Sequence, residues 1–163
     1  MTDMTDAEVS AVDFAVVAYR DEGDWSLAEL PGRALDDVDT IANELRRYPG
    51  ENGALAMISV DEDFVLVVRV QGSLVRVLLS DATAATDWTL ARSAVDHLGV
   101  HVGVDDEQAP AGDLGIVADM GFSAAEMAAL LDDFELYPEE VLSEVAGGIG
   151  FGEKFDEIVD LAD

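Results

Sequence analysis

The sequence predicts an α+β fold, in which an antiparallel five-stranded sheet with the order ββαβββα precedes a helical C-terminal subdomain. Three observations predict it. Five short segments are rich in β-branched, aliphatic and aromatic residues, as buried strands are. Two segments among them carry apolar residues at helical spacing, and the patterns beyond residue 112 are helical. Half of the 163 residues are apolar, so a large core can form.

A β-hairpin is expected to begin the fold. Residues 12–19 (VDFAVVAY) are typical of a buried strand, and residues 25–30 (WSLAEL) alternate apolar and polar side chains as a half-buried strand does. The residues between them (RDEGD) have turn chemistry, with Gly23 able to adopt a positive φ. Pro31 and Gly32 then end the hairpin.

An amphipathic helix over residues 36–47 follows the hairpin. Two aspartates at its start and two arginines at its end complement the helix dipole. The tripeptide Tyr48-Pro49-Gly50 ends it. The apolar stripe consists of Leu35, Val38, Ile41, Ala42 and Leu45.

Three strands and a second helix complete the sheet region. The strands occupy residues 54–60, 64–70 and 74–79. Connectors of three residues permit only antiparallel neighbours. Arg69 and Arg76 interrupt apolar runs, so each is expected to point out of the core or to reach past it to a carboxylate. The second helix spans residues 87–98, and Thr86 or Asp87 can cap it.

The chain is expected to divide where glycine, proline and an acidic run indicate a linker. The predicted parts are a flexible tail at 1–11, the sheet domain at 12–99, the linker at 100–112 and an acidic helical subdomain at 113–163. Within the last part, Ser123 and Glu126 have the spacing of a capping box, and Pro138 suits the first turn of a further helix. The glycine-rich residues 147–152 break that helix.

Charge is the extreme feature of the composition. The chain has 36 acidic and 8 basic residues, which gives a formal net charge of −28. Such a surface repels the phosphates of nucleic acids and anionic membranes, so direct binding of either is not expected. It fits a basic partner steered by the electrostatic field, and it also fits an adaptation for solubility or for a salty cytoplasm.

Composition and motifs exclude several classes of site. The absence of cysteine rules out disulfides, thiolate zinc sites and a cysteine nucleophile. No signal peptide is indicated, and the apolar runs fall far short of the about 20 residues that span a bilayer, so a cytoplasmic location is expected. No nucleotide-binding loop or serine-hydrolase motif occurs, and neither a cofactor nor a catalytic residue is predicted.

Two features resemble metal sites but have simpler explanations. His97 and His101 lie four residues apart, yet Gly99 interrupts the helix that would align them. The acidic runs at residues 61–63 and 105–107 lack the ligand spacing of a calcium loop and suit solvated turns. No metal site is therefore predicted.

A denser acidic patch is the candidate partner-binding surface. It lies in the predicted helical subdomain, which holds one lysine and no arginine. The patch consists of Asp132, Asp133, Glu135, Glu139 and Glu140. One interpretation is a docking face for a basic partner, and the other is the hydrated side of a helical hairpin.

Five segments of the chain form a recognisable set. They are VDFAVVAYRDEGDW (12–25), GALAMISVDEDFVLVVRV (53–70), VRVLLSDATAATDW (75–88), PAGDLGIVADMG (110–121) and LYPEEVLSEVAGGIGFGEKFDEIVD (136–160). Together they resemble the bacterial family of tRNA adenosine deaminase-associated proteins. The likeness covers nearly the whole chain after residue 11, and the strings SVDEDF, LLSDATAA and GFGEKF are its most specific parts.

The resemblance implies a role beside the tRNA-editing adenosine deaminase and carries no catalytic residues with it. Deaminase chemistry requires a zinc held by His and Cys beside a glutamate, whereas this chain has no Cys and no His-x-Glu. The expected function is a non-catalytic protein that binds tRNA adenosine deaminase and modulates it through its acidic surface. Two alternatives stay open: a general interaction scaffold of the longin or profilin type, unrelated to tRNA editing, and an unassigned enzyme that uses carboxylates.

Overall fold

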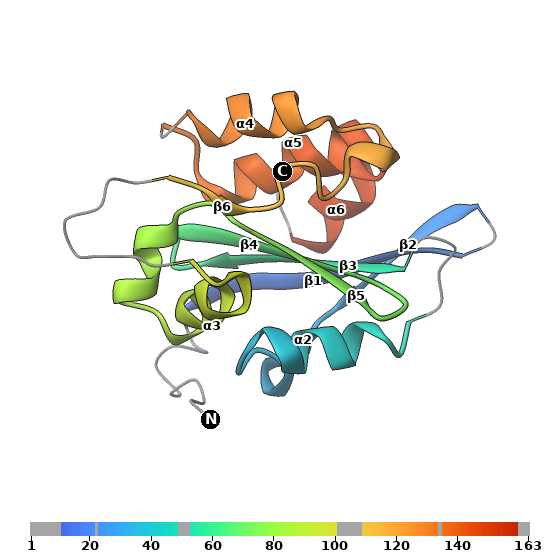
Figure 1. Ribbon diagram of the computed structural model, residues 1–163. Helices are drawn as coiled ribbons and strands as arrows, with labels where there is room; N and C mark the ends of the chain where they lie inside the picture. The colour runs from blue at the N-terminus through green and yellow to red at the C-terminus, as the bar shows by residue number, and fades with distance from the viewer. Residues whose placement is uncertain (1–10, 22, 49–52, 101–108, 134, 160–163) are drawn as a thin grey trace.

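The chain folds into three layers, with an antiparallel sheet between two layers of helices (Figure 1). A computed structural model describes residues 11–21, 23–48, 53–100, 109–133 and 135–159. The six strands, in the spatial order β2-β1-β3-β4-β5-β6, are β1 (Val12–Asp21), β2 (Asp24–Glu29), β3 (Ala54–Val60), β4 (Phe64–Gln71), β5 (Leu74–Leu79) and β6 (Ala111–Gly112). The α-helices are α2 (Val38–Leu45), α3 (Thr89–Leu98), α4 (Ala124–Leu131), α5 (Pro138–Ile149) and α6 (Gly152–Ile158). Short 3-10 helices are η1 (Gly32–Ala34), η2 (Ala82–Thr86) and η3 (Ala118–Met120).

A sixth strand corrects the predicted count of five, while the antiparallel sheet and its helices are confirmed. β6 lies at the end of the segment predicted to be a linker, and it pairs with β5 through Leu78↔Gly112 and Leu79↔Ala111. Gly112 has a φ of +106°, and a Cβ there would lie 2.2 Å from the carbonyl oxygen of Val77. Two residues are too few to show an alternating pattern, so no strand could be predicted here from periodicity.

Helices α2 and α3 cover one face of the sheet, below it in Figure 1. Helix α2 buries the predicted stripe from Val38 to Leu45, whereas Leu35 lies before the helix. Helix α3 buries Leu90, Ala91, Ala94 and Val95 at the same helical spacing. The Asp37 carboxylate caps α2 by accepting the backbone N–H of Thr40 at 2.7 Å. The predicted caps of α3 were wrong, because Thr86 is the last residue of η2, Asp87 follows it, and Trp88 occupies the N-cap position without a side-chain hydrogen bond.

The helices that follow residue 113 cover the opposite face, above the sheet in Figure 1. The ββαβββα order alone requires helices on one face of the sheet only, so these later helices add the second layer. With both faces covered, every residue of β3 is buried, which explains why six of its seven residues are apolar. The sheet side chains that pack against these helices include Val16, Leu55, Met57, Val65, Val67 and Leu78. They share a cluster with Met127, Leu131, Leu142, Val145, Ile149 and Phe155 from the helices.

Arg69 lies within this second core and is fully buried. Its guanidinium donates two parallel hydrogen bonds to the Asp119 carboxylate, at 2.6 and 2.9 Å, and a third to the carbonyl of Ile116 at 2.7 Å. A buried guanidinium is costly unless a carboxylate and further acceptors compensate for its lost hydration. Arg69 therefore requires residues 116–119 to lie against the sheet.

Arg76 forms the second half of the same arrangement. It lies directly opposite Arg69 in the β4–β5 register, where two like charges would repel each other. Its Nε donates to the Asp113 carboxylate at 2.6 Å, and its guanidinium also donates to the carbonyl of Gly115 at 2.8 Å. We call these two arginines with Asp113 and Asp119 the arginine clamp. The clamp fastens the segment between β6 and α4 to the sheet, which confirms the expectation that these arginines reach past the core to carboxylates.

Replacing Asp119 by asparagine should lower the free energy of unfolding by about 2–3 kcal/mol at pH 7, because it leaves the buried Arg69 charge without its partner. The expected loss is at the low end for such pairs because half of the Asp119 side chain is exposed. Hydrogen bonding to Arg69 lowers the pKa of Asp119, against the opposing effect of partial burial. The extra free energy of unfolding of the wild-type protein over Asp119→Asn should therefore be complete above about pH 4. It should disappear as the pH falls through the pKa of Asp119 in the folded state. Urea unfolding of both proteins across this range checks it, and a difference that does not change with pH would contradict it.

The division into a sheet domain and a helical subdomain stays a prediction, and truncation tests it. A chain that ends at residue 112 lacks both clamp carboxylates and exposes the second face of the sheet. We expect it to aggregate or unfold, because an apolar face of this size is not stable in water. Circular dichroism and size-exclusion chromatography provide the measurement, with deletion of residues 1–10 as the control. A folded monomer would show that the helices are an independent appendage.

Candidate functional site

The five acidic residues predicted to bind a partner lie where α4 ends and α5 begins. Four are exposed and Glu139 is half-buried. We call them the acidic surface: Asp132, Asp133, Glu135, Glu139 and Glu140. The predicted capping box at Ser123 and Glu126 is present and sets where α4 begins, and Pro138 opens α5 as expected. Local sequence signals therefore position this surface.

Short-range hydrogen bonds hold the loop between these helices. The Asp133 carboxylate accepts the backbone N–H of Glu135, and the Glu140 carboxylate accepts that of Tyr137, both at 3.1 Å. Tyr137 leaves 55% of its surface exposed among these carboxylates. An exposed aromatic side chain within a charged rim is common in protein-binding surfaces.

A cavity of about 180 Å³ adjoins the acidic surface and shares Asp133 with it. We call it the acidic pocket. Carboxylates from three distant parts of the chain line it: Glu62, Asp63, Asp81 and Asp133. Apolar side chains form much of the remaining wall: Val65, Leu130, Leu131, Leu136, Pro138 and Val141. The pocket therefore combines an apolar wall with a negative charge that no described basic side chain in its lining offsets.

The turn between β3 and β4 supplies two of these carboxylates and has a strained backbone. Asp61 and Glu62 both have a φ of +49°, which is unfavourable for residues other than glycine. Asp13 stabilises the turn, since its carboxylate accepts the N–H of Glu62 at 2.8 Å and the hydroxyl of Ser59 at 2.9 Å. The Trp88 indole donates to Asp63 at 2.9 Å. The turn is thus held in one conformation by neighbouring elements.

Sequence reasoning missed the pocket because it treated residues 61–63 as a solvated turn. The structure places Glu62 and Asp63 in the same cavity as Asp81 and Asp133. The one available signal was a three-residue hairpin connection without glycine or asparagine, which is unusual for a tight turn. The acidic run at residues 105–107 lies outside the described residues.

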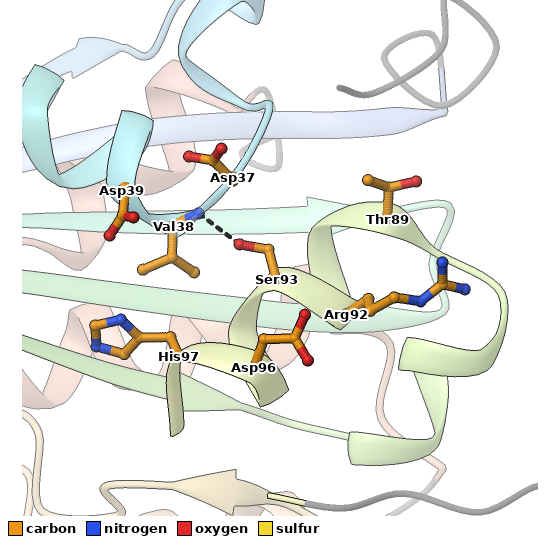
Figure 2. A pocket seen from close by; sticks show the side chains of 8 residues that line it. All are labelled: Asp37, Val38, Asp39, Thr89, Arg92, Ser93, Asp96 and His97. Atoms are coloured by element: carbon orange, nitrogen blue, oxygen red, sulfur yellow. Dashed lines mark hydrogen bonds between the residues drawn. The ribbon is translucent and has the colours of Figure 1, made fainter. Parts of the chain in front are cut away.

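A second cavity, of about 430 Å³, lies between the start of α2 and the exposed side of α3 (Figure 2). In Figure 2 the backbone N–H of Val38 donates to the Ser93 hydroxyl, at 2.8 Å. Three acidic residues, Asp37, Asp39 and Asp96, line this cavity with one arginine, Arg92. The cavity is therefore also acidic, although Arg92 offsets part of its negative charge.

His97 lines the second cavity, whereas its proposed partner His101 lies outside the described residues. Figure 2 shows the His97 ring and the Asp96 carboxylate pointing in different directions from the end of α3. Among the described residues, no group of three or more His, Cys, Asp or Glu side chains could hold a metal ion. No catalytic constellation emerges from these contacts.

The glycine-rich residues 147–152 serve packing. α5 continues through the first two glycines and ends at Ile149, so the break falls later than predicted. A Cβ on Gly148 would lie 2.4 Å from Cδ1 of Phe122, and a Cβ on Gly152 would lie 3.0 Å from the Cα of Gly147. Glycine therefore allows α6 and the Phe122 ring to approach α5 closely.

The basic side chains make hydrogen bonds, ion pairs or a cation–π contact with other parts of the chain. Arg69 and Arg76 form the clamp, and Lys154 donates to the carbonyl of Trp25 at 2.6 Å. Arg20 stacks over the Trp25 ring, 5.0 Å from its centroid. The other four make contacts at helix ends: Arg33 and Arg47 with Glu44, Arg46 with Asn43, and Arg92 with the carbonyl of Ala85. The acidic surface therefore has little cationic charge near it.

The fold and this surface define an α+β protein of three layers whose C-terminal helical layer carries concentrated negative charge. A family model described as Rv3753c-like tRNA adenosine deaminase-associated protein matches residues 13–152, and the chain belongs to this family. Protein Rv3753c of Mycobacterium tuberculosis (strain ATCC 25618 / H37Rv) is 32% identical over 151 residues, which cover 90% of this chain and 87% of that relative. The resemblance inferred from the sequence is thereby confirmed.

No solved structure matches this chain. None of the described helices combines the length and apolar character needed to cross a bilayer.

The strained turn leads to a stability prediction. Glu62→Gly should raise the free energy of unfolding by roughly 0.5–1 kcal/mol. The left-handed conformation costs a residue other than glycine about 1–2 kcal/mol, and relief of this strain exceeds the entropic cost of ordering the more flexible glycine. Glu62→Gln, which keeps the strain and removes the charge, is the control and should change stability little. Thermal unfolding measures both. A lower melting temperature for Glu62→Gly would contradict the account of the turn.

Proposed function

We propose that this protein is a non-catalytic partner that binds tRNA adenosine deaminase through its acidic surface. Family membership supports the identity of the partner. The concentration of carboxylates around the α4–α5 loop, with Tyr137 exposed among them, is the structural observation that supports this location. The basic residues of the chain are engaged elsewhere, so the surface keeps its negative potential.

Electrostatics supports a partner that itself binds RNA. A tRNA-binding enzyme presents lysine and arginine to phosphates, and such a face attracts a protein with a net charge of −28. The acidic surface either occupies the tRNA-binding face or docks beside it. The first arrangement inhibits editing by competing with tRNA, and the second leaves tRNA binding intact and stabilises or activates the enzyme.

A role as a carboxylate enzyme has less support. A general acid at neutral pH needs a carboxyl whose pKa is raised. Asp119, in contrast, has a lowered pKa because Arg69 donates hydrogen bonds to it, and its carboxylate belongs to the clamp. The deaminase reaction requires cysteine ligands for zinc, which the sequence lacks.

The test is binding to the purified deaminase of the same organism, at low and moderate salt. The wild-type complex should weaken as salt rises, because surface charges are screened beyond a Debye length of about 8 Å at physiological ionic strength. Reversing Asp132 and Glu139 to lysine should weaken it by about tenfold or more, since these residues lie in the acidic surface.

A matched control distinguishes the effect of this surface on binding from the effect of the net charge of the protein. Asp39 lies in the first turn of α2 as Glu139 does in α5, and Asp96 lies near the end of α3 as Asp132 does at the end of α4. Reversing Asp39 and Asp96 changes the net charge equally on the opposite layer and should have a much smaller effect. Equal losses for both pairs, or no complex at either salt concentration, would contradict the proposal. An editing assay with and without this protein then distinguishes inhibition from activation.

A further inference from the structure

The acidic pocket has the dimensions and chemistry of a site for a single side chain. Its volume of about 180 Å³ is well below the roughly 300–1,000 Å³ of pockets for cofactors and drug-sized ligands. Apolar side chains of α4, α5 and the loop between them form one part of the wall, and carboxylates from three segments form another. A ligand that fits must therefore be small, partly apolar and positively charged.

Metal ions do not match this wall. A calcium or magnesium ion needs converging oxygen ligands, and no three described His, Cys, Asp or Glu side chains lie close enough together to hold one. Leu131, Leu136 and Val141 supply no oxygen ligands from their side chains. A long basic side chain matches better, because its hydrocarbon stem packs against apolar groups while its charged end reaches carboxylates.

Arginine fits better than lysine. The acidic residues of the lining come from separate segments, and a guanidinium presents five N–H donors in different directions, whereas an ammonium is a compact charge. A guanidinium is also hydrated more weakly, so its transfer from water into a partly apolar pocket costs less.

The pocket is organised before any ligand arrives. Asp81 is 7% exposed, and its carboxylate accepts the N–H of Thr83 at 2.9 Å and its hydroxyl at 2.6 Å. Asp63 is oriented by the Trp88 indole, and Asp13 fixes the backbone of Glu62. Preorganised carboxylates lose little entropy on binding, which favours a specific contact over diffuse attraction.

We propose that the acidic pocket receives an arginine side chain of the partner protein, and that this contact fixes the register of the acidic surface on that partner. The inference rests on the proposed function for the identity of the partner, although the preference for arginine follows from the pocket alone. The isolated pocket and the complex can therefore be tested separately.

In the first arm of the experiment, the intact protein is titrated with N-acetyl-arginine amide as the probe. NMR of the backbone amides monitors the binding. We expect saturable shifts at Val65, Leu131 and Val141, with a dissociation constant on the order of millimolar for so small a ligand. The neutral isostere N-acetyl-citrulline amide should not bind, and the lysine analogue should bind more weakly. Equal shifts with citrulline, or none at the pocket with arginine, would overturn the proposal.

The second arm compares two neutralising pairs in binding to the deaminase. Glu62→Gln with Asp133→Asn alters the pocket, whereas Asp132→Asn with Glu139→Gln alters the acidic surface outside it by the same charge. We expect about thirty-fold weaker binding for the pocket pair, as for a central anchor, and less than about fivefold for the other pair. Equal losses of affinity for the two pairs would overturn the proposal that the pocket is the anchor of the complex. If the wild-type protein binds no deaminase, the proposed function fails, and the arginine titration alone decides whether the pocket binds arginine.

Discussion

Two arginine side chains lie opposite each other on β4 and β5, on a face of the sheet that is mainly apolar. In isolation this arrangement is unfavourable, because it combines like-charge repulsion with the removal of a guanidinium from water. Asp113, Asp119 and the carbonyls of Gly115 and Ile116 compensate for both costs, and all of them come from the short segment between β6 and α4. The path of that segment, and with it the start of the last three helices, follows from the need to neutralise two charges.

The clamp also connects the fold to the surface charge. The ion pairs of the described residues join arginines to Glu44, Asp113 and Asp119, so none of these pairs neutralises a carboxylate of the acidic surface. The helical layer that the clamp fastens in place comes from residues after 112, which include one lysine and no arginine. α4 and α5 in turn bring Asp133 to the strained β3–β4 turn, so the acidic pocket exists only when the second helical layer is docked on the sheet.

Much of the fold could be predicted from local patterns. The strand runs at 54–60 and 64–70, the stripe of α2 and the capping box of α4 depend on neighbours within a few residues, and the structure contains them. Features that depend on distant residues could not be predicted in the same way. β6 is only two residues long, and its pairing with β5 needs Gly112 beside Val77. The acidic surface is contiguous in sequence and was found, whereas the acidic pocket joins Glu62, Asp81 and Asp133 and required the tertiary fold.

If the acidic surface and its pocket form one face that binds the deaminase, the contact can be located on the intact chain by hydrogen–deuterium exchange, with and without the purified deaminase. We expect slower exchange in the β3–β4 turn and around the α4–α5 loop, with the α2–α3 layer unchanged. Protection confined to the cavity between α2 and α3, or no protection in the presence of a formed complex, would contradict this expectation.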